Sequence, residues 1–193
     1  LRRQRQMCIR DSGTTAIGNQ DKTSLEGYQI GNNEFGGGVS DGVNGIIAYK
    51  GKYNELQANK AYFFFDNMMF CIGSDISYVQ NDNVLTSVEQ NLLNGEVIYN
   101  DGQEKQLSSN SNMQLKQLKW VSHNNTGYIF RGTDNVTIQN MSQAGSWKDI
   151  NATGESGLID KNVFSVWINH GLNPENASYQ YICLLYTSPS PRD

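Results

Sequence analysis

The chain has 193 residues, with 15 Lys or Arg, 19 Asp or Glu and a formal net charge of −4 at pH 7. This length is enough for one domain with a packed core. No apolar stretch approaches the roughly 20 residues of a membrane-spanning helix. The acidic balance argues against nucleic acid and against a membrane surface as partners.

The two ends of the chain differ from its middle. Leu1–Ser12 reads LRRQRQMCIRDS and Cys183–Asp193 reads CLLYTSPSPRD. The hexapeptide that begins at Cys183 can be encoded as TGTCTCTTATACACATCT, and the reverse complement of this DNA contains codons for the residues Met7 to Asp11 in frame. We therefore interpret residues 1–12 and 183–193 as translated adapter sequence, and residues 13–182 as a fragment of a natural domain with a net charge near −7.

Within residues 13–182, short apolar runs rich in aromatic and β-branched residues alternate with Gly, Asn and Ser, a pattern typical of strands. Helical periodicity is almost absent. We expect an all-β fold, a large antiparallel β-sandwich, with these strands: Gly45–Lys50, Ala61–Phe65, Met68–Ile72, Val84–Leu93, Glu96–Tyr99, Met113–Val121, Gly127–Arg131, Asn135–Gln139, Val163–Asn169 and Ser178–Ile182.

Two turns and one strand carry the strongest local signals. Asp66-Asn67 and Asn94-Gly95 each suit a two-residue hairpin turn between neighbouring strands. In the run from Val163 to His170, both alternating faces are largely apolar. This pattern favours an inner strand of stacked sheets over an edge strand.

Few residues are candidates for chemistry. His123 and His170 are the only histidines, and neither lies at ligand spacing from a second His or Cys, so we expect both to be hydrogen-bonding rather than catalytic residues. We do not pair His123 with Tyr128 as base and acid, because no orienting third group is apparent. Cys71, the only cysteine of the middle segment, is expected to be a small buried apolar residue.

The Gly-rich run Asn32–Gly42 is the one metal candidate. Glu34 and Asp41 could bind calcium with backbone carbonyls, but their spacing is not that of a known calcium loop, and a structural bend is the alternative that we favour. No Lys-Ser/Thr follows the glycines, so the run is not a phosphate loop. Three tryptophans could stack on sugar rings, although Trp on a strand more often lies in the core: Trp120, Trp147 and Trp167.

Several motifs in order resemble a known family. They are FGGGVSDG from Phe35, KAYFFFD from Lys60, CIGS from Cys71, GYIF from Gly127, GSWKDIN from Gly145, VFSVWINHG from Val163 and YQYI from Tyr179. Together they resemble the central β-domain of polysaccharide lyase family 8, which includes chondroitin AC, hyaluronate and xanthan lyases. The stretch from Gly13 to Thr15 is similar to that family's Pro-Gly-Thr-Thr sequence, with Ser12 in place of proline.

The resemblance implies an incomplete domain of supersandwich type, from an enzyme that cleaves acidic, uronic-acid-containing polysaccharides by β-elimination. In that family, a helical toroid absent from this chain supplies the catalytic Asn, His, Tyr and Arg, and no motif for them matches here. We therefore assign no catalytic residue, including His123, Tyr128 and Arg131, and expect the chain alone to be inactive. The resemblance further implies a secreted or periplasmic bacterial enzyme that requires no cofactor, with calcium as an optional ligand.

Two other classes remain open. A non-catalytic carbohydrate-binding sandwich would fit the tryptophans and the all-β pattern, and it should present at least two coplanar exposed aromatic rings. A purely structural surface sandwich would have no affinity for sugar.

Overall fold

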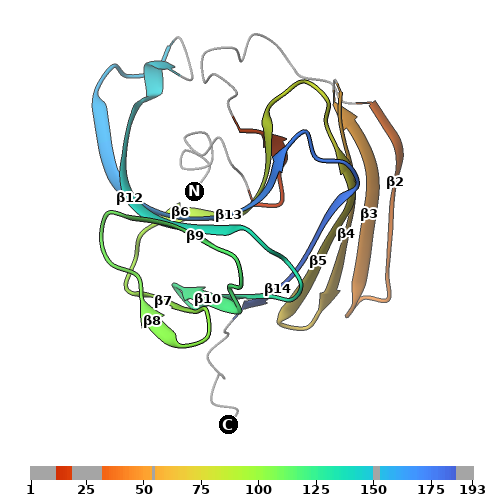
Figure 1. The fold of residues 1–193 in the computed structure, drawn as a ribbon, viewed down its shortest axis with the longest axis horizontal. Helices are drawn as coiled ribbons and strands as arrows, with labels where there is room; N and C mark the ends of the chain where they lie inside the picture. Colours follow the sequence, from red (N-terminus) through yellow and green to blue (C-terminus); the bar gives the residue numbers. More distant parts are fainter. Residues whose placement is uncertain (1–11, 19–31, 54, 150–152, 186–193) are drawn as a thin grey trace.

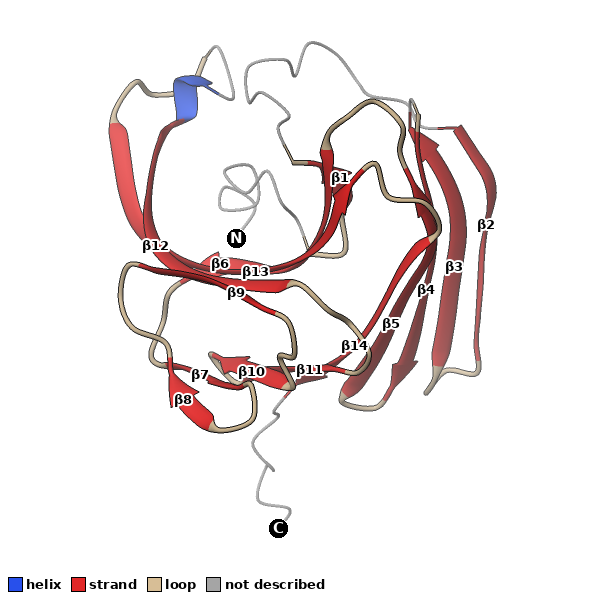
Figure 2. Cartoon of the chain, in the orientation of Figure 1, coloured by secondary structure: helices blue, strands red, loops and turns tan. Residues whose placement is uncertain are grey.

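A computed structural model describes residues 12–18, 32–53, 55–149 and 153–185 of the chain. Over these residues the chain forms two antiparallel sheets, and its helical structure is limited to the 3-10 turn Trp147–Asp149. Figure 2 shows the predominance of strands. The expected all-β, antiparallel sandwich is confirmed.

The smaller sheet has five strands and crosses the centre of Figure 1. In spatial order its strands are β1 (Thr15–Ile17), β6 (Asn83–Leu92), β13 (Leu158–Leu172), β12 (Val136–Ser146) and β9 (Ser111–Leu115).

The larger sheet has nine strands and curves around one side of the smaller sheet (Figure 1). Its spatial order is β2 (Asn32–Ser40), β3 (Gly45–Tyr53), β4 (Leu56–Phe65), β5 (Met68–Ser77), β14 (Ala177–Leu185), β11 (Thr126–Phe130), β10 (Trp120–His123), β7 (Val97–Asn100) and β8 (Glu104–Gln106).

The core lies between the two sheets. Strand β13 is central in its sheet, paired with β6 on one side and with β12 on the other. Its side chains Phe164, Val166 and Ile168 are almost fully buried, as are Cys71 and Val121 of the opposite sheet. Each such aliphatic or aromatic side chain contributes about 1.5–3 kcal/mol by leaving water. The inner-strand prediction for β13 and the burial of Cys71 are both confirmed.

One of the two predicted hairpins is present. Asp66-Asn67 joins β4 to β5, which pair directly, and Asp66 has the positive φ of 45° that such a turn requires. The Asn94-Gly95 prediction is wrong, because β6 belongs to the smaller sheet and β7 to the larger one. The residues of a turn determine its local backbone geometry but not which sheet each flanking strand joins. Here the turn carries the chain from the smaller sheet to the larger one.

Two other expectations need correction. The predicted strand Met113–Val121 is two strands, β9 and β10, which lie in different sheets. The Gly-rich run is not a bend over its length, because Asn32–Ser40 forms strand β2 and only the following residues turn. Glycine leaves a strand without side-chain packing but does not prevent ladder hydrogen bonds.

The second predicted tail also begins in a strand. Cys183, Leu184 and Leu185 extend β14 and pair with β11, the first two also pair with β5, and Cys183 is buried. Strand pairing uses backbone groups that every residue carries, and these three apolar residues continue the alternation of β14. Of the predicted N-terminal tail, only Ser12 lies within the described residues, and it is exposed.

Among the described residues, no helix is long and apolar enough to cross a membrane.

Candidate functional site

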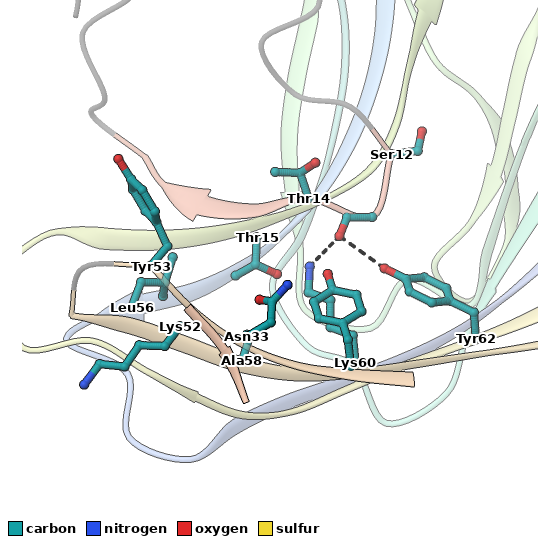
Figure 3. A pocket seen from close by; sticks show the side chains of 13 residues that line it. Ser12, Thr14, Thr15, Asn33, Lys52, Tyr53, Leu56, Ala58, Lys60 and Tyr62 are labelled. Carbon is teal, nitrogen blue, oxygen red and sulfur yellow. Dashed lines mark hydrogen bonds between the residues drawn. The ribbon is translucent and has the colours of Figure 1, made fainter. Parts of the chain in front are cut away.

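An open pocket of about 350 Å³ lies between β1 and the inner face of β3 and β4. Figure 3 shows Lys60 and Tyr62 reaching from β4 toward the chain at Gly13. The alternation of β4 places Ala58, Lys60 and Tyr62 on one face, and Tyr49 of β3 is the direct cross-strand partner of Lys60. The pocket therefore brings Lys60 and Tyr62 of β4 together with Tyr49 of the adjacent strand β3.

Lys60 is the most unusual residue of the pocket. It is only 4% exposed, and its ammonium group donates a hydrogen bond to the carbonyl oxygen of Gly13. The hydroxyl of Tyr62 donates to the same oxygen over 3.4 Å. Burial lowers the pKa of Lys60 to about 7. Both donors are directed at the backbone that precedes β1, so this pair fixes β1 against the larger sheet.

Tyr179 and His170 extend this polar cluster inward. A Cβ at Gly73 would lie 2.1 Å from a ring carbon of Tyr179, so the ring covers that glycine. The rings of His170 and Tyr179 are 5.9 Å apart, and His170 Nε2 is 2.7 Å from Thr86 Oγ1. Burial, with a smaller effect of the Lys60 charge, lowers the pKa of His170 to about 4. His170 is therefore neutral at pH 7.

His123 is also a structural residue. It is 3% exposed, its Nε2 accepts a 3.1 Å hydrogen bond from the Asn94 amide, and its ring lies 4.7 Å from that of Phe164. Burial lowers its pKa. Both histidines thus make hydrogen bonds, as the sequence predicted. Tyr128 is buried in the core and Arg131 is exposed.

The structure does not bring Glu34 and Asp41 together. Glu34 lies near the start of β2 and forms a 2.7 Å ion pair with Lys50. Asp41 follows the end of β2, and its carboxylate accepts hydrogen bonds from the amides of Val43 and Asn44. Seven residues of extended chain span roughly 23 Å, so the two carboxylates cannot share one ion. Within the described ranges, no group of three or more His, Cys, Asp or Glu could hold a metal.

The tryptophans do not form a sugar-stacking platform. Trp120, Trp147 and Trp167 are each only partly exposed. Trp120 belongs to the larger sheet and Trp167 to the smaller one, so they share no face.

Sequence reasoning did not single out two buried ionisable residues. Lys60 begins the motif KAYFFFD, and its signal in the sequence is a lysine at an inward position between Ala58 and Tyr62. Glu89 of β6 is 4% exposed, accepts a hydrogen bond from the Asn91 side chain and has its pKa raised to about 7 by burial. A carboxylate in a run of strand residues gives no sign of which face it occupies when a bulge lies directly before it, as one does here at Val88.

Comparison with known proteins places the chain in a family. Residues 10–191 match the family described as polysaccharide lyase family 8, super-sandwich domain. The chain belongs to polysaccharide lyase family 8. Within that family, chondroitinase-AC of Pedobacter heparinus is 41% identical over 162 residues, which are 84% of this chain and 23% of that protein. Xanthan lyase of Bacillus sp. strain GL1 is 30% identical over 155 residues, which are 74% of this chain and 17% of that protein.

Solved structures of family members share the fold. A chondroitinase AC lyase studied as oligosaccharide complexes superposes with a TM-score of 0.82 and 37% identity, over 92% of this chain and 27% of that one. A Paenibacillus xanthan lyase gives a TM-score of 0.81 and 26% identity, over 93% of this chain and 18% of that one. The chain thus spans about a quarter or less of the length of these family 8 relatives.

Proposed function

We propose that this chain is the β-sandwich part of a bacterial, secreted or periplasmic lyase that cleaves uronic-acid-containing polysaccharides of the chondroitin or hyaluronan type by β-elimination. The observation that carries the proposal is the 41% identity to chondroitinase-AC over 84% of this chain. The chondroitinase AC lyase structure supports it with a TM-score of 0.82.

In β-elimination, a base removes the proton at C5 of the uronic acid, and the sugar linked through O4 leaves with a proton from an acid. The C5 carbanion becomes the C4–C5 double bond of the product, and neighbouring donors must stabilise the carboxylate while charge builds up. The buried groups described above are poorly suited to these roles. His123 and His170 lie inside the sandwich, and Lys60 donates to Gly13.

We therefore propose that the catalytic groups come from another part of the parent protein, and that the sandwich supports them and forms one wall of the substrate cleft. We also propose that the elimination requires no cofactor. The isolated chain would then be inactive.

A hybrid enzyme tests this proposal. The 162 matched residues of chondroitinase-AC are replaced by the corresponding residues of this chain, and both the hybrid and the isolated chain are incubated with chondroitin. The expected result is an increase in the ultraviolet absorbance of unsaturated uronate with the hybrid and none with the isolated chain. A hybrid that melts cooperatively but shows no lysis would contradict the proposed activity. Lysis by the isolated chain would contradict the proposed location of the catalytic groups.

A further inference from the structure

The sequence contains two Asn-Gly pairs, Asn44-Gly45 and Asn94-Gly95. An asparagine that precedes a glycine can react spontaneously, because the amide nitrogen of the glycine can attack the carboxamide carbon of the asparagine. Glycine favours this attack, since it has no Cβ to keep the two groups apart. The two reacting groups belong to neighbouring residues, so the backbone already holds them close together. The two pairs differ in how the fold exposes them to this reaction.

The Asn94-Gly95 pair is open to solvent. Both residues are exposed, and they carry the chain from β6 in the smaller sheet to β7 in the larger one (Figure 1). Gly95 has a φ of 83°, and apart from its chain neighbours no described atom lies within 4 Å of the place where its Cβ would be. Among the described residues, no group accepts a hydrogen bond from the Gly95 amide. Water and base can therefore reach the nitrogen that must lose its proton.

The Asn44-Gly45 pair lies in a loop that hydrogen bonds hold in place. The backbone amide and the Nδ2 group of Asn44 donate to the Asp41 carboxylate over 2.6 Å and 3.2 Å, and the Asn44 carbonyl accepts from the Asp41 amide. Gly45 is the first residue of β3 and pairs with Ser40 and Phe64 on the two adjacent strands. The Gly45 nitrogen can therefore attack the Asn44 side chain only after the end of β3 opens.

We propose that Asn94 is a site of spontaneous deamidation in the folded protein, and that its products loosen the crossover from β6 to β7. The Gly95 nitrogen gives its proton to a base in solution and forms a bond with Cγ of Asn94. The Cγ–Nδ2 bond breaks, and Nδ2 leaves as ammonia. One water molecule then opens the resulting succinimide ring at either of its carbonyl carbons, which gives aspartate or isoaspartate.

The structural effect follows from the two hydrogen bonds that Asn94 donates. Its backbone amide donates to Nε2 of the buried His123, and its Nδ2 group donates to Oδ1 of Asn124, each over 3.1 Å. His123 is the last residue of β10, and Asn124 lies in the turn to β11. Deamidation removes the Nδ2 donor and places a carboxylate, which only accepts hydrogen bonds, beside Oδ1 of Asn124. Isoaspartate also lengthens the backbone of the crossover. The attachment of this crossover to the β10–β11 turn should therefore weaken.

Incubation of the 193-residue chain in mildly alkaline buffer, with and without urea, tests the site. Peptide mapping measures the conversion of each asparagine, and an isoaspartate methyltransferase labels the isoaspartate. In urea, the two Asn-Gly pairs should react at similar rates. In the folded chain, Asn94 should react at least about tenfold faster than Asn44, because Asn44 reacts only from a locally opened state. Equal rates in the folded chain, or an Asn94 rate more than about tenfold below its rate in urea, would overturn the proposal.

Two matched variants separate this site from the other. Asn94→Gln keeps a carboxamide, but attack on it must form a larger ring, so this variant should stop the reaction at the crossover. Asn44→Gln should leave the reaction at Asn94 unchanged. Circular dichroism before incubation establishes that each variant is folded. Ammonia release from folded Asn94→Gln at the rate of the parent chain would overturn the assignment of Asn94.

The effect on the crossover is measured on the reacted chain itself. Anion exchange separates the deamidated chain by its added negative charge, and this chain should melt about 2–4 °C below the unreacted chain. An unchanged Tm would overturn the proposed loosening of the crossover. None of these measurements depends on lyase activity.

Discussion

At the scale of single residues, the interior of the sandwich combines apolar side chains with ionisable ones whose pKa values burial shifts in the direction that favours the neutral form. Cys71 behaves as predicted from its isolation in the sequence, since it is fully buried and burial raises the pKa of its thiol to about 11. Lys60 and Glu89 were not predicted, because alternation in a sequence shows which residues share a face but not which face is inside. Only the packing of the second sheet decides that.

Lys60 should give the protein a pH-dependent stability that one substitution removes. Its pKa is about 7 in the folded protein and 10.5 ordinarily. Between these values the unfolded chain binds more protons, so the free energy of unfolding rises with pH, by up to about 1.4 kcal/mol per unit. This contribution to the free energy of unfolding is fully present above pH 10.5 and is lost as the pH falls to 7. Urea unfolding between pH 7 and 8.5 should therefore show a smaller positive slope for Lys60→Met than for the parent.

Lys52→Met is the matched control, because Lys52 is exposed on the neighbouring strand β3. Its slope should equal that of the parent chain. Identical slopes for the parent and Lys60→Met would show that Lys60 remains protonated in the folded state.

At the scale of elements, turn residues predicted the geometry of a turn better than its place in the fold. Asp66-Asn67 was assigned correctly because β4 and β5 are neighbours in both sequence and space. The stronger signal at Asn94-Gly95 failed because its flanking strands, β6 and β7, belong to different sheets. The predicted strand Met113–Val121 failed because the chain changes sheet inside it, between β9 and β10. The adjacent polar pair Lys116-Gln117, which interrupts the alternation of apolar residues, marks this break in the sequence.

The turn between β10 and β11 provides a test of local backbone energetics. Asn124 and Asn125 have φ values of 48° and 61°, the left-handed region that asparagine tolerates better than most residues with a side chain. Asn125→Ala should reduce the free energy of unfolding by about 1 kcal/mol, because Cβ crowds the following carbonyl there. Asn125→Gly should leave it within about 0.5 kcal/mol of the parent.

Chemical denaturation of the two variants measures this difference. Since Asn125 is exposed, both substitutions change little packing. A loss of stability as large for Asn125→Gly as for Asn125→Ala would show that the side chain, rather than the backbone angle, stabilises the turn.

At the scale of the whole molecule, the phenols of the inner face form a connected buried layer. Burial is the main cause that raises the pKa of Tyr62, Tyr179 and Tyr181 above the ordinary value of 10. The rings of Tyr179 and Tyr181 stack with centroids 5.9 Å apart. The sequence predicted a large sandwich with a central β13, but it did not predict this layer, because its members come from β4 and β14, far apart in the chain.

These phenols should make alkaline unfolding cooperative. A phenol whose pKa is higher in the folded than in the unfolded chain stabilises the fold fully below pH 10, which is its pKa in the unfolded chain. This stabilisation is lost as the pH rises further. Tyrosinate absorbance of the buried phenols and loss of the strand circular dichroism signal should therefore change together above pH 10. Tyr179→Phe should shift this transition to higher pH, because it removes one of the buried phenols whose ionisation destabilises the fold. Absorbance that rises fully before the circular dichroism changes would show that these phenols ionise within the intact fold.

The position of β14 has a consequence for the order of folding. This strand is the last described element of the chain, yet it pairs with β5 on one side and β11 on the other, so it joins the two parts of the larger sheet. Until β14 emerges from the ribosome, β5 and β11 each present an unpaired edge, and their eventual partner is still unsynthesised. Contacts between segments this distant in sequence make folding slow, and exposed edges favour pairing with other chains. Nascent chains that end before Ala177 should therefore require chaperones, even though most of the core residues are already present.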